Sequence, residues 1–357
     1  MVHVWAMSAN DQPVSASGPL AGIRIVEMPA IGPVPHAGLV LAELGADVTR
    51  ITRTAPSDLG IAVDARFDSL ARGKQEVALD LKHPAGLEAA RTLIGSADAL
   101  LEGFRPGVME RLGLGPHPCL AANPRLVYGR ISGWGDAGPL AEEAGHDLNY
   151  LGLTGILHAI GMPGEPPPVP LNLIGDFGGA AMQLACGVLA ALHAARATGR
   201  GRVVATSIYE GAAALTPHLH GLRAAGLWSD RRADNILDGA APFYRTYTAA
   251  DGRFVAVGAI EPRFYRALLA GLDLPLDPAA QMDRAAWPGT AQAFADRFAT
   301  APRDEWVARF AGTDACVSPV LDWAEAVRHP QAVALALYQE IGLPRTGARL
   351  SASPASK

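Results

Sequence analysis

Two short segments of the chain carry side chains that can move a proton. Residues 144–150 (AGHDLNY) place the imidazole of His146 beside the carboxylate of Asp147, in a turn next to a glycine. Residues 173–179 (LIGDFGG) place Asp176 where an apolar, strand-like run gives way to a long helical pattern. An aspartate at a helix start is more often a cap than a catalyst, because free N–H groups and the helix dipole stabilise an anion there. The presence of an imidazole and a carboxylate on separate loops nevertheless favours one acid–base site built from His146 and Asp176.

The elements that must hold these loops alternate between strand and helix. Apolar runs predict strands at residues 23–28, 46–51, 77–82, 97–102, 126–132 and 201–207. Helical patterns are expected at residues 37–44, 84–95, 177–197 and 209–225, with an irregular loop at 54–72. This alternation predicts an α/β fold in which helices cover a mainly parallel sheet, and such sheets bind ligands at the carboxyl ends of their strands. The glycines after the first strand do not match GxGxxG, so no dinucleotide fingerprint is expected.

A second, smaller domain is expected because 357 residues exceed the usual size of one domain. Residues 244–249 and 253–260 alternate around an Asp-Gly pair, which predicts an antiparallel hairpin. A helix from Pro262, two amphipathic helices within 288–311 and a strand at 317–321 follow it. We therefore expect a large domain at residues 1–225 that residues 326–357 complete, a linker at 226–237 and a small α+β domain at 238–325.

Several basic side chains follow the ends of expected strands. Arg53, Lys82 and Arg105 each come at or just after such an end, and Arg111 lies on a short helix nearby. Together they predict a site for phosphate groups, although a solvated surface charge explains any one of them alone. Glu261 lies between the second hairpin strand and a helix. It is either an N-terminal helix charge or a carboxylate that orients an imidazole.

The composition limits the kinds of binding partner and the cellular compartment that we expect. The formal net charge of −5 argues against a general nucleic-acid surface. Three cysteines far apart fit free thiols in a reducing, cytoplasmic compartment, and neither a disulfide framework nor a zinc site. Residues 1–18 lack the pattern of a secretory signal. The apolar run 178–198 is interrupted by three polar side chains, which predicts a buried helix and no membrane span.

A series of short motifs follows in order along the chain. These are PLAGIRIVE (19–27), LGADV (44–48), LDLK (79–82), RPG (105–107), RLG (111–113), GWG (133–135), GHDLNY (145–150) and GDFGG (175–179). Together they resemble the family III CoA-transferase (CaiB/BaiF) superfamily. Within it the chain is most similar to racemases that act on 2-methylacyl-CoA thioesters, mainly through His146-Asp147, Asn172 and Glu261.

The resemblance implies a Rossmann-like large domain and a small domain in an interlocked homodimer. Each active site would lie between the large domain of one subunit and the small domain of the other. His146 and Asp176 would be the two proton carriers, and Glu261 would support the histidine. The substrate itself brings the CoA, so neither a further cofactor nor a metal is expected. The residues implied to contact the acyl-CoA are Arg53, Leu79, Asp80, Leu81, Lys82, Arg105, Arg111, Gly145, Asp147, Leu148, Asn149, Tyr150 and Asn172.

Two other classes of function stay open at this point. A CoA-transferase of the superfamily would use the carboxylate of Asp176 as a nucleophile, so Asp176 alone does not separate transfer from racemisation. A non-catalytic acyl-CoA-binding protein is the third class. The combination of His146, Asp176 and Glu261 favours proton transfer over both alternatives.

Overall fold

The computed structural model describes residues 18–55, 64–339 and 343–346, and these residues form two compact units. The first unit takes the described residues within 1–154, 170–216 and 333–357. The second takes residues 155–169 and 217–332. The expectation about a signal in residues 1–18 falls almost entirely outside the described residues.

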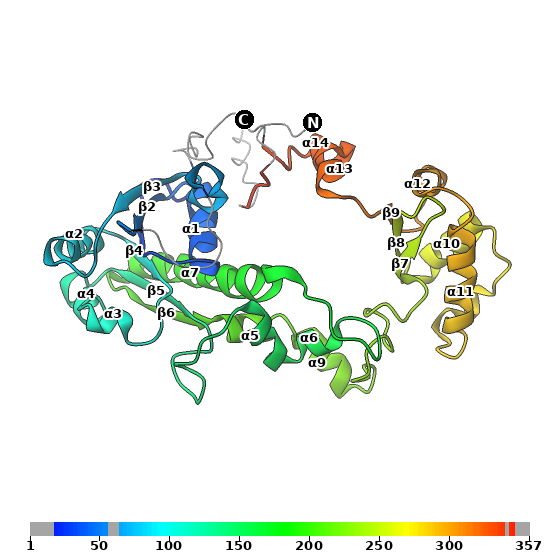
Figure 1. Ribbon diagram of the computed structural model, residues 1–357, viewed down its shortest axis with the longest axis horizontal. Helices are drawn as coiled ribbons and strands as arrows, with labels where there is room; N and C mark the ends of the chain where they lie inside the picture. Colours follow the sequence, from blue (N-terminus) through cyan, green and yellow to red (C-terminus); the bar gives the residue numbers. More distant parts are fainter. Residues whose placement is uncertain (1–17, 56–63, 340–342, 347–357) are drawn as a thin grey trace. The chain divides into compact units, whose positions relative to one another are not determined.

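A six-stranded parallel sheet forms the centre of the first unit (Figure 1). Its strands lie in the order β3-β2-β1-β4-β5-β6, and every neighbouring pair is parallel. The strand order reverses between β1 and β4, and in doubly wound sheets ligands bind outside the carboxyl ends of the strands at that point. The strands are β1 (Arg24–Glu27), β2 (Asp47–Thr52), β3 (Lys74–Ala78), β4 (Ala99–Glu102), β5 (Val127–Ser132) and β6 (Arg202–Ser207).

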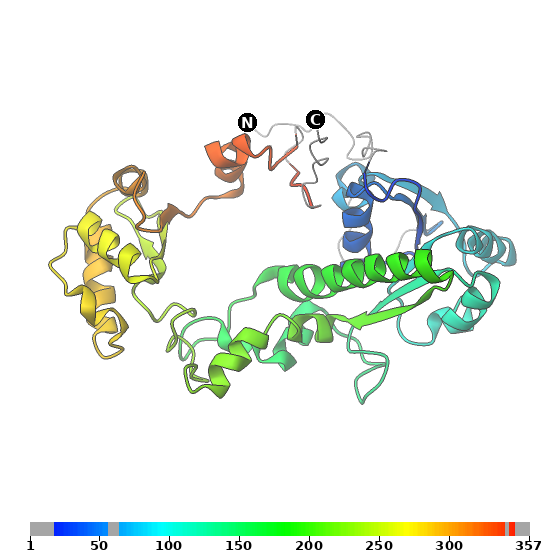
Figure 2. The same cartoon turned by 180° about the vertical axis from the view of Figure 1, so that it is seen from behind.

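Helices cover both faces of this sheet because alternate strand residues are apolar on both sides. Ile25 and Leu101 pack with α1 (Pro33–Glu43) and α7 (Met182–Thr198) on one face. The other face carries Val26, Leu100 and Tyr128, which pack against one helix that follows β3 and two helices that follow β4. These helices are α2 (Pro84–Gly95), α3 (Val108–Arg111) and α4 (Pro116–Ala122). Figures 1 and 2 show α7 as the long green helix beside the sheet.

Two further segments of the first unit pack beside α7. A short 3₁₀ turn, η4 (Leu171–Leu173), leads into the π-helix η5 (Ile174–Ala181), which continues into α7. Against η5 pack α5 (Asp147–Thr154) and α8 (Ile208–Ala213). By length and composition alone the run Leu171–Thr198 could cross a membrane. In this fold, however, α7 buries residues such as Leu184, Val188 and Leu192 in the core of the first unit.

The second unit is built around a three-stranded antiparallel sheet, β7-β8-β9. An aromatic core that includes Phe243, Tyr265, Phe294 and Trp306 packs this sheet against its helices. The strands are β7 (Tyr244–Thr248), β8 (Phe254–Gly258) and β9 (Val317–Pro319). The helices are α6 (Ile156–Ala159), α9 (Pro217–Ala224), α10 (Pro262–Leu272), α11 (Trp287–Phe298), α12 (Arg303–Phe310) and α13 (Trp323–Arg328), with α14 (Pro330–Ala334) at the boundary between the units.

The predicted fold class is confirmed: a parallel α/β sheet and a separate small α+β unit are both present. Three predicted elements were wrong. The strand expected at 77–82 is β3 at Lys74–Ala78, and the strand-like run before Asp176 is helical. The helix expected at 209–225 is two helices, because Pro217 lacks the N–H that a continuous helix needs and instead begins α9.

The boundaries of the compact units differ from those expected for the domains. The second unit includes the expected linker, 226–237, as well as residues 155–169, 217–225 and 326–332. The reason is local structure in the linker: Asn235 is buried and its amide donates to Ser229 O at 3.0 Å and to Asp238 Oδ2 at 2.8 Å. Ile236 packs against the core of the second unit.

A buried ion pair lies beneath α1 in the first unit. Lys74 Nζ on β3 is 2.6 Å from Glu27 Oε2 on β1, and both side chains are almost fully buried. Lys74 also donates to the carbonyl of Pro35 at 2.7 Å. Burial raises the pKa of Glu27 and lowers that of Lys74, and the attraction between the two opposes each shift. The pair thus connects two strands to the first turn of α1.

We expect Lys74→Met to destabilise the protein strongly. Glu27 would stay buried with only the Arg50 guanidinium, 3.5 Å away, as a neighbouring cation. Breaking a buried pair on one side costs about 3 kcal/mol or more. Urea unfolding followed by circular dichroism measures the loss. The matched control is Arg91→Met, which breaks an exposed pair with Glu88 and should cost at most about 0.5 kcal/mol. Equal losses in the two variants would contradict a structural role for the buried pair.

Candidate functional site

The carboxylate of Asp176 lies in the first turn of η5, close to the loop that follows β1. Asn172 Nδ2 donates to Asp176 Oδ2 at 3.2 Å. On the other side is Gly32, which has a left-handed φ of 67°. A Cβ at Gly32 would lie only 3.1 Å from Asp176 Oδ2, so this turn needs a glycine for two reasons. Asp176 therefore lies where the loop after β1 begins α1, beside the point at which the strand order reverses.

Asp147 joins this carboxylate to the segment that carries His146. The backbone N–H of Asp176 donates to Asp147 Oδ1 at 2.7 Å, across 29 residues of sequence. The Asp147 side chain is buried, and its Oδ2 has no hydrogen-bond partner in the part of the chain that the structure describes. His146 itself is exposed; its N–H donates to Asn149 Oδ1 at 3.0 Å, and its carbonyl accepts from the N–H of Asn149. This bonding fixes the backbone of the turn and leaves the imidazole exposed.

The electrostatics of Asp176 suit a group that gains and loses a proton near neutral pH. Burial raises its pKa to about 6; the negative charge of Asp147 acts in the same direction. The hydrogen bond from Asn172 and the positive charge of His146 act against this rise. His146 and Asp176 are therefore close enough for their charges to interact. That they form one acid–base site stays a prediction.

Tyr150 connects the cluster to the loop after β4. Its hydroxyl donates to the carbonyl of Gly145 at 2.6 Å, and its ring packs edge-on against Trp134 with centroids 4.6 Å apart. Burial raises the pKa of Tyr150; Asp176 raises it further and Arg105 lowers it. Asp176 and Arg105 therefore act on the same hydroxyl from different loops.

The basic residues predicted to bind phosphate lie at the carboxyl edge of the sheet. Arg53 follows β2, Lys82 ends the turn after β3 and Arg105 follows β4, while Arg111 lies in α3. All four are exposed, and none forms an ion pair with another residue in the part of the chain that the structure describes. Leu79 to Lys82 form a turn in which the N–H of Lys82 donates to Asp80 Oδ1 at 2.9 Å. This edge can therefore receive an anionic group.

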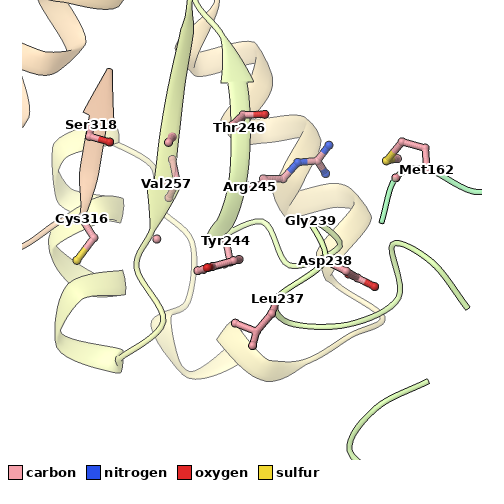
Figure 3. A pocket seen from close by; sticks show the side chains of 13 residues that line it. Met162, Leu237, Asp238, Gly239, Tyr244, Arg245, Thr246, Val257, Cys316 and Ser318 are labelled. Atoms are coloured by element: carbon pink, nitrogen blue, oxygen red, sulfur yellow. The ribbon is translucent and has the colours of Figure 1, made fainter. Parts of the chain in front are cut away.

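Glu261 belongs to the second unit and not to the cluster of the first. It is the N-cap of α10, and its side chain is exposed and makes no cap hydrogen bond. Burial raises the pKa of Cys316, and the negative charge of Glu261 raises it further, so the two side chains are near enough for their charges to interact. Cys316 lines a cavity of about 620 Å³ together with Tyr244, Thr246 and Val257 (Figure 3). Glu261 itself does not line this cavity, but it acts electrostatically on Cys316, which does.

Two residues near the cluster are not among the predicted site residues. The backbone of Gly32 lies against Asp176, although the glycines around it match no dinucleotide motif. Trp134, part of the GWG motif, packs on Tyr150 and carries an indole N–H without a partner among the described residues. The Gly-Pro pair at the start of α1 is a signal that could have pointed to Gly32. Among the described residues, no group of three or more His, Cys, Asp or Glu side chains could hold a metal ion.

The chain is similar to known proteins over almost its whole length. Residues 20–356 match the family described as CoA-transferase family III. Alpha-methylacyl-CoA racemase from Mus musculus is 45% identical over 94% of this chain and 87% of its own length. The Homo sapiens protein of the same name is 46% identical over 87% and 80%, respectively. The crystal structure of a CAIB/BAIF family protein from Brucella suis has a TM-score of 0.78 and 25% identity, and covers 94% of this chain and 93% of that one.

Proposed function

The chain belongs to CoA-transferase family III, and we propose that it interconverts the R and S forms of 2-methylacyl-CoA thioesters. The observation that carries this proposal is the position of Asp176. Its carboxyl, with a pKa of about 6, lies within electrostatic reach of His146 at the reversal point of the sheet. An acid and a base held on two loops can deprotonate a carbon from one side and reprotonate it from the other.

The reaction passes through an enolate. An α-proton beside a thioester is only weakly acidic, so the charge that forms on the carbonyl oxygen needs fixed donors. Backbone N–H groups around Asp147, at the start of α5, are the candidates in this chain. Removing such a donor typically costs about 3–4 kcal/mol of transition-state stabilisation. One of His146 and Asp176 removes the proton, and the other returns one to the opposite face. The roles exchange with the direction of the reaction.

The CoA part of the substrate supplies binding energy far from the reacting carbon. We propose that its phosphates contact Arg53, Lys82, Arg105 and Arg111, which are exposed and unpaired among the described residues. Leu79 to Lys82, Gly145, Leu148, Asn149 and Tyr150 would contact the rest of the thioester, with Asn172 beside the carboxylate of Asp176. Binding of the CoA part, far from the reacting carbon, can position C2 between the two proton carriers. Proton transfer at C2 needs no redox or metal chemistry, so we propose that the substrate's CoA is the only coenzyme involved.

A direct test follows deuterium at C2. The purified protein is incubated with one enantiomer of a 2-methylacyl-CoA in heavy water, and NMR follows both exchange and configuration. We expect deuterium uptake together with inversion. Binding of the thioester without exchange would exclude racemisation.

The pH dependence of deuterium exchange at C2 should show the ionisation of the Asp176 carboxyl. With Asp176 as the base, exchange of the enantiomer that it deprotonates requires the carboxylate. The rate should therefore fall about tenfold per pH unit below pH 6. His146→Ala isolates this dependence, because Asp176 is then the only base of the pair that can start exchange. The initial exchange rate of this variant, measured between pH 5 and pH 8, checks it. A rate that stayed constant below pH 6 would contradict the assignment of Asp176 as one of the two bases.

We propose further that the protein works in the cytoplasm as a homodimer in which Glu261 supports the His146 of the other subunit. The support is the family resemblance and the position of Glu261, an exposed carboxylate at the start of α10. The three cysteines of the protein are free thiols, which suits a reducing compartment.

Co-expression of two inactive variants tests this arrangement. If a site combines the first unit of one subunit with the second unit of another, a mixed dimer of Asp176→Asn and Glu261→Gln contains one intact site. Random pairing then restores roughly a quarter of wild-type activity. A double variant carrying both changes in one chain, co-expressed with itself, is the control. No recovery above this control would show that both residues act within one chain.

CoA transfer is the second candidate function, because the same carboxylate can act as a nucleophile. The family description supports it as well. Asp176 would then attack the thioester to give an acyl anhydride and afterwards an aspartyl-CoA thioester. Incubation with acyl-CoA alone, followed by mass spectrometry of the peptide containing Asp176, separates the two functions. A covalent adduct on Asp176 favours transfer, and an unmodified peptide with exchange at C2 favours racemisation.

A further inference from the structure

We propose that the side chain of Asp147 is a positioning residue that holds the Asp176 carboxylate in place and keeps it able to carry a proton. This inference deepens the proposed racemisation and rests on it for its kinetic test. The backbone N–H of Asp147 is a candidate oxyanion donor. The side chain has a separate task, which follows from its contact with the first turn of η5.

The start of η5 needs a hydrogen-bond acceptor from elsewhere in the chain. Leu173, the residue before this π-helix, makes no side-chain hydrogen bond that caps it. The N–H of Asp176 donates to Asp147 Oδ1 at 2.7 Å, and the N–H of Gly175 also favours the ionised Asp147. Asp147 therefore serves as a cap supplied by α5, the helix that begins directly after His146.

The packing around this hydrogen bond leaves no room for the Asp147 carboxylate to move. Gly175 is buried, and a Cβ there would lie 2.5 Å from Asp147 Oδ1 and 3.0 Å from Ile208 Cγ2. Asp147 is itself only 6% exposed. A shift of the carboxylate would therefore move the first turn of η5, and with it Asp176, relative to His146.

The charge of Asp147 has its own effect. Burial raises the pKa of Asp147, the N–H groups of Asp176 and Gly175 oppose this rise, and its Oδ2 has no hydrogen-bond partner among the described residues. The negative charge of Asp147 disfavours ionised Asp176, whereas His146 favours it. Of the other titratable groups on neighbouring elements, His36 of α1 stacks on Phe177, and Glu210 of α8 accepts from Ser207. Asp147 is thus the only acid among the charges acting on Asp176 that raises its pKa in the described part of the chain.

Two substitutions separate position from charge. Asp147→Asn keeps an oxygen that accepts the N–H of Asp176 but removes the charge, so kcat should stay within about tenfold and the acid limb of the kcat profile should move to lower pH. Asp147→Ala removes the acceptor as well, and a misplaced Asp176 should lower kcat about 100-fold with little change in KM. Asp98→Asn is the matched control. Its Oδ2 accepts the N–H of Arg24 at 2.8 Å outside the site, so its kinetics should match the wild type.

The same role can be measured without substrate. Carbon-13 NMR of the Asp176 carboxyl should show a pKa of about 6 in the wild-type protein and a lower value in Asp147→Asn. An unchanged Asp176 titration together with an unmoved acid limb in Asp147→Asn would overturn the proposal, as would full kcat in folded Asp147→Ala. If the wild-type protein showed no exchange at C2, the proposed function would fail, while the NMR titration would still decide whether Asp147 acts on Asp176.

Discussion

Asp176→Asn is expected to abolish epimerisation and to leave a one-sided exchange reaction. His146 can still remove the proton from the enantiomer that faces it, but no acid is left on the opposite side to invert the configuration. That enantiomer should take up deuterium with retention, and the other should not exchange. The loss of epimerisation should be about 10³-fold, the middle of the range for a positioned acid or base. Chiral chromatography and NMR of the same samples measure both quantities.

The same substitution should stabilise the protein at alkaline pH. The folded-state pKa of Asp176 is raised to about 6, so the folded protein binds this proton more tightly than the unfolded chain does. Its contribution to stability is therefore fully present below the ordinary pKa of an aspartate and is lost as pH rises from there through 6, and asparagine has no such loss. Thermal unfolding at pH 4 and pH 8 should show the variant gaining stability relative to the wild type at pH 8. A variant that is destabilised at pH 8 would contradict the position described for the carboxylate.

His146→Ala is expected to give the complementary result. The enantiomer that faces Asp176 should exchange with retention, and epimerisation should again fall about 10³-fold. Stability should change little because the imidazole is exposed and the bonds of His146 to Asn149 use backbone atoms. His218→Ala is a control, since it removes another exposed imidazole on α9 of the second unit. If both site variants exchanged the same enantiomer, the two groups would not lie on opposite sides of C2.

The parallel core was predictable from the sequence because its central strands are apolar on both faces. β3 was placed too late for a physical reason. It is an edge strand that begins with Lys74, Gln75 and Glu76. Glu76 pairs with Arg50 on the neighbouring strand β2, and Lys74 pairs with Glu27 on β1, the strand beyond it. A pattern of alternating apolar residues does not reveal such a strand. Leu79 and Leu81 alternate as strand residues would, but they lie in the turn that follows β3.

The error before Asp176 has a similar origin. Val169, Leu171 and Leu173 alternate with other residues as a strand would, but all three are exposed and the last two lie in a 3₁₀ turn. The segment is held instead by contacts from distant parts of the chain, above all the bond from Asp176 to Asp147. The motifs identified both aspartates, but no local pattern reports that one caps the backbone of the other.

The winding of η5 has a consequence for how this region tolerates change. A π-turn behaves as an α-helix that has gained one residue. If residues 174–181 wound as a regular α-helix with no residue removed, the side chains at the start of the segment would be rotated by about 100° relative to α7, the angle that one residue spans. Asp176 would then face away from the loop after β1, although every amino acid of the cluster was still present. Changes that convert this winding to a regular α-helix should therefore be far more damaging than exchanges of one side chain for another of similar size.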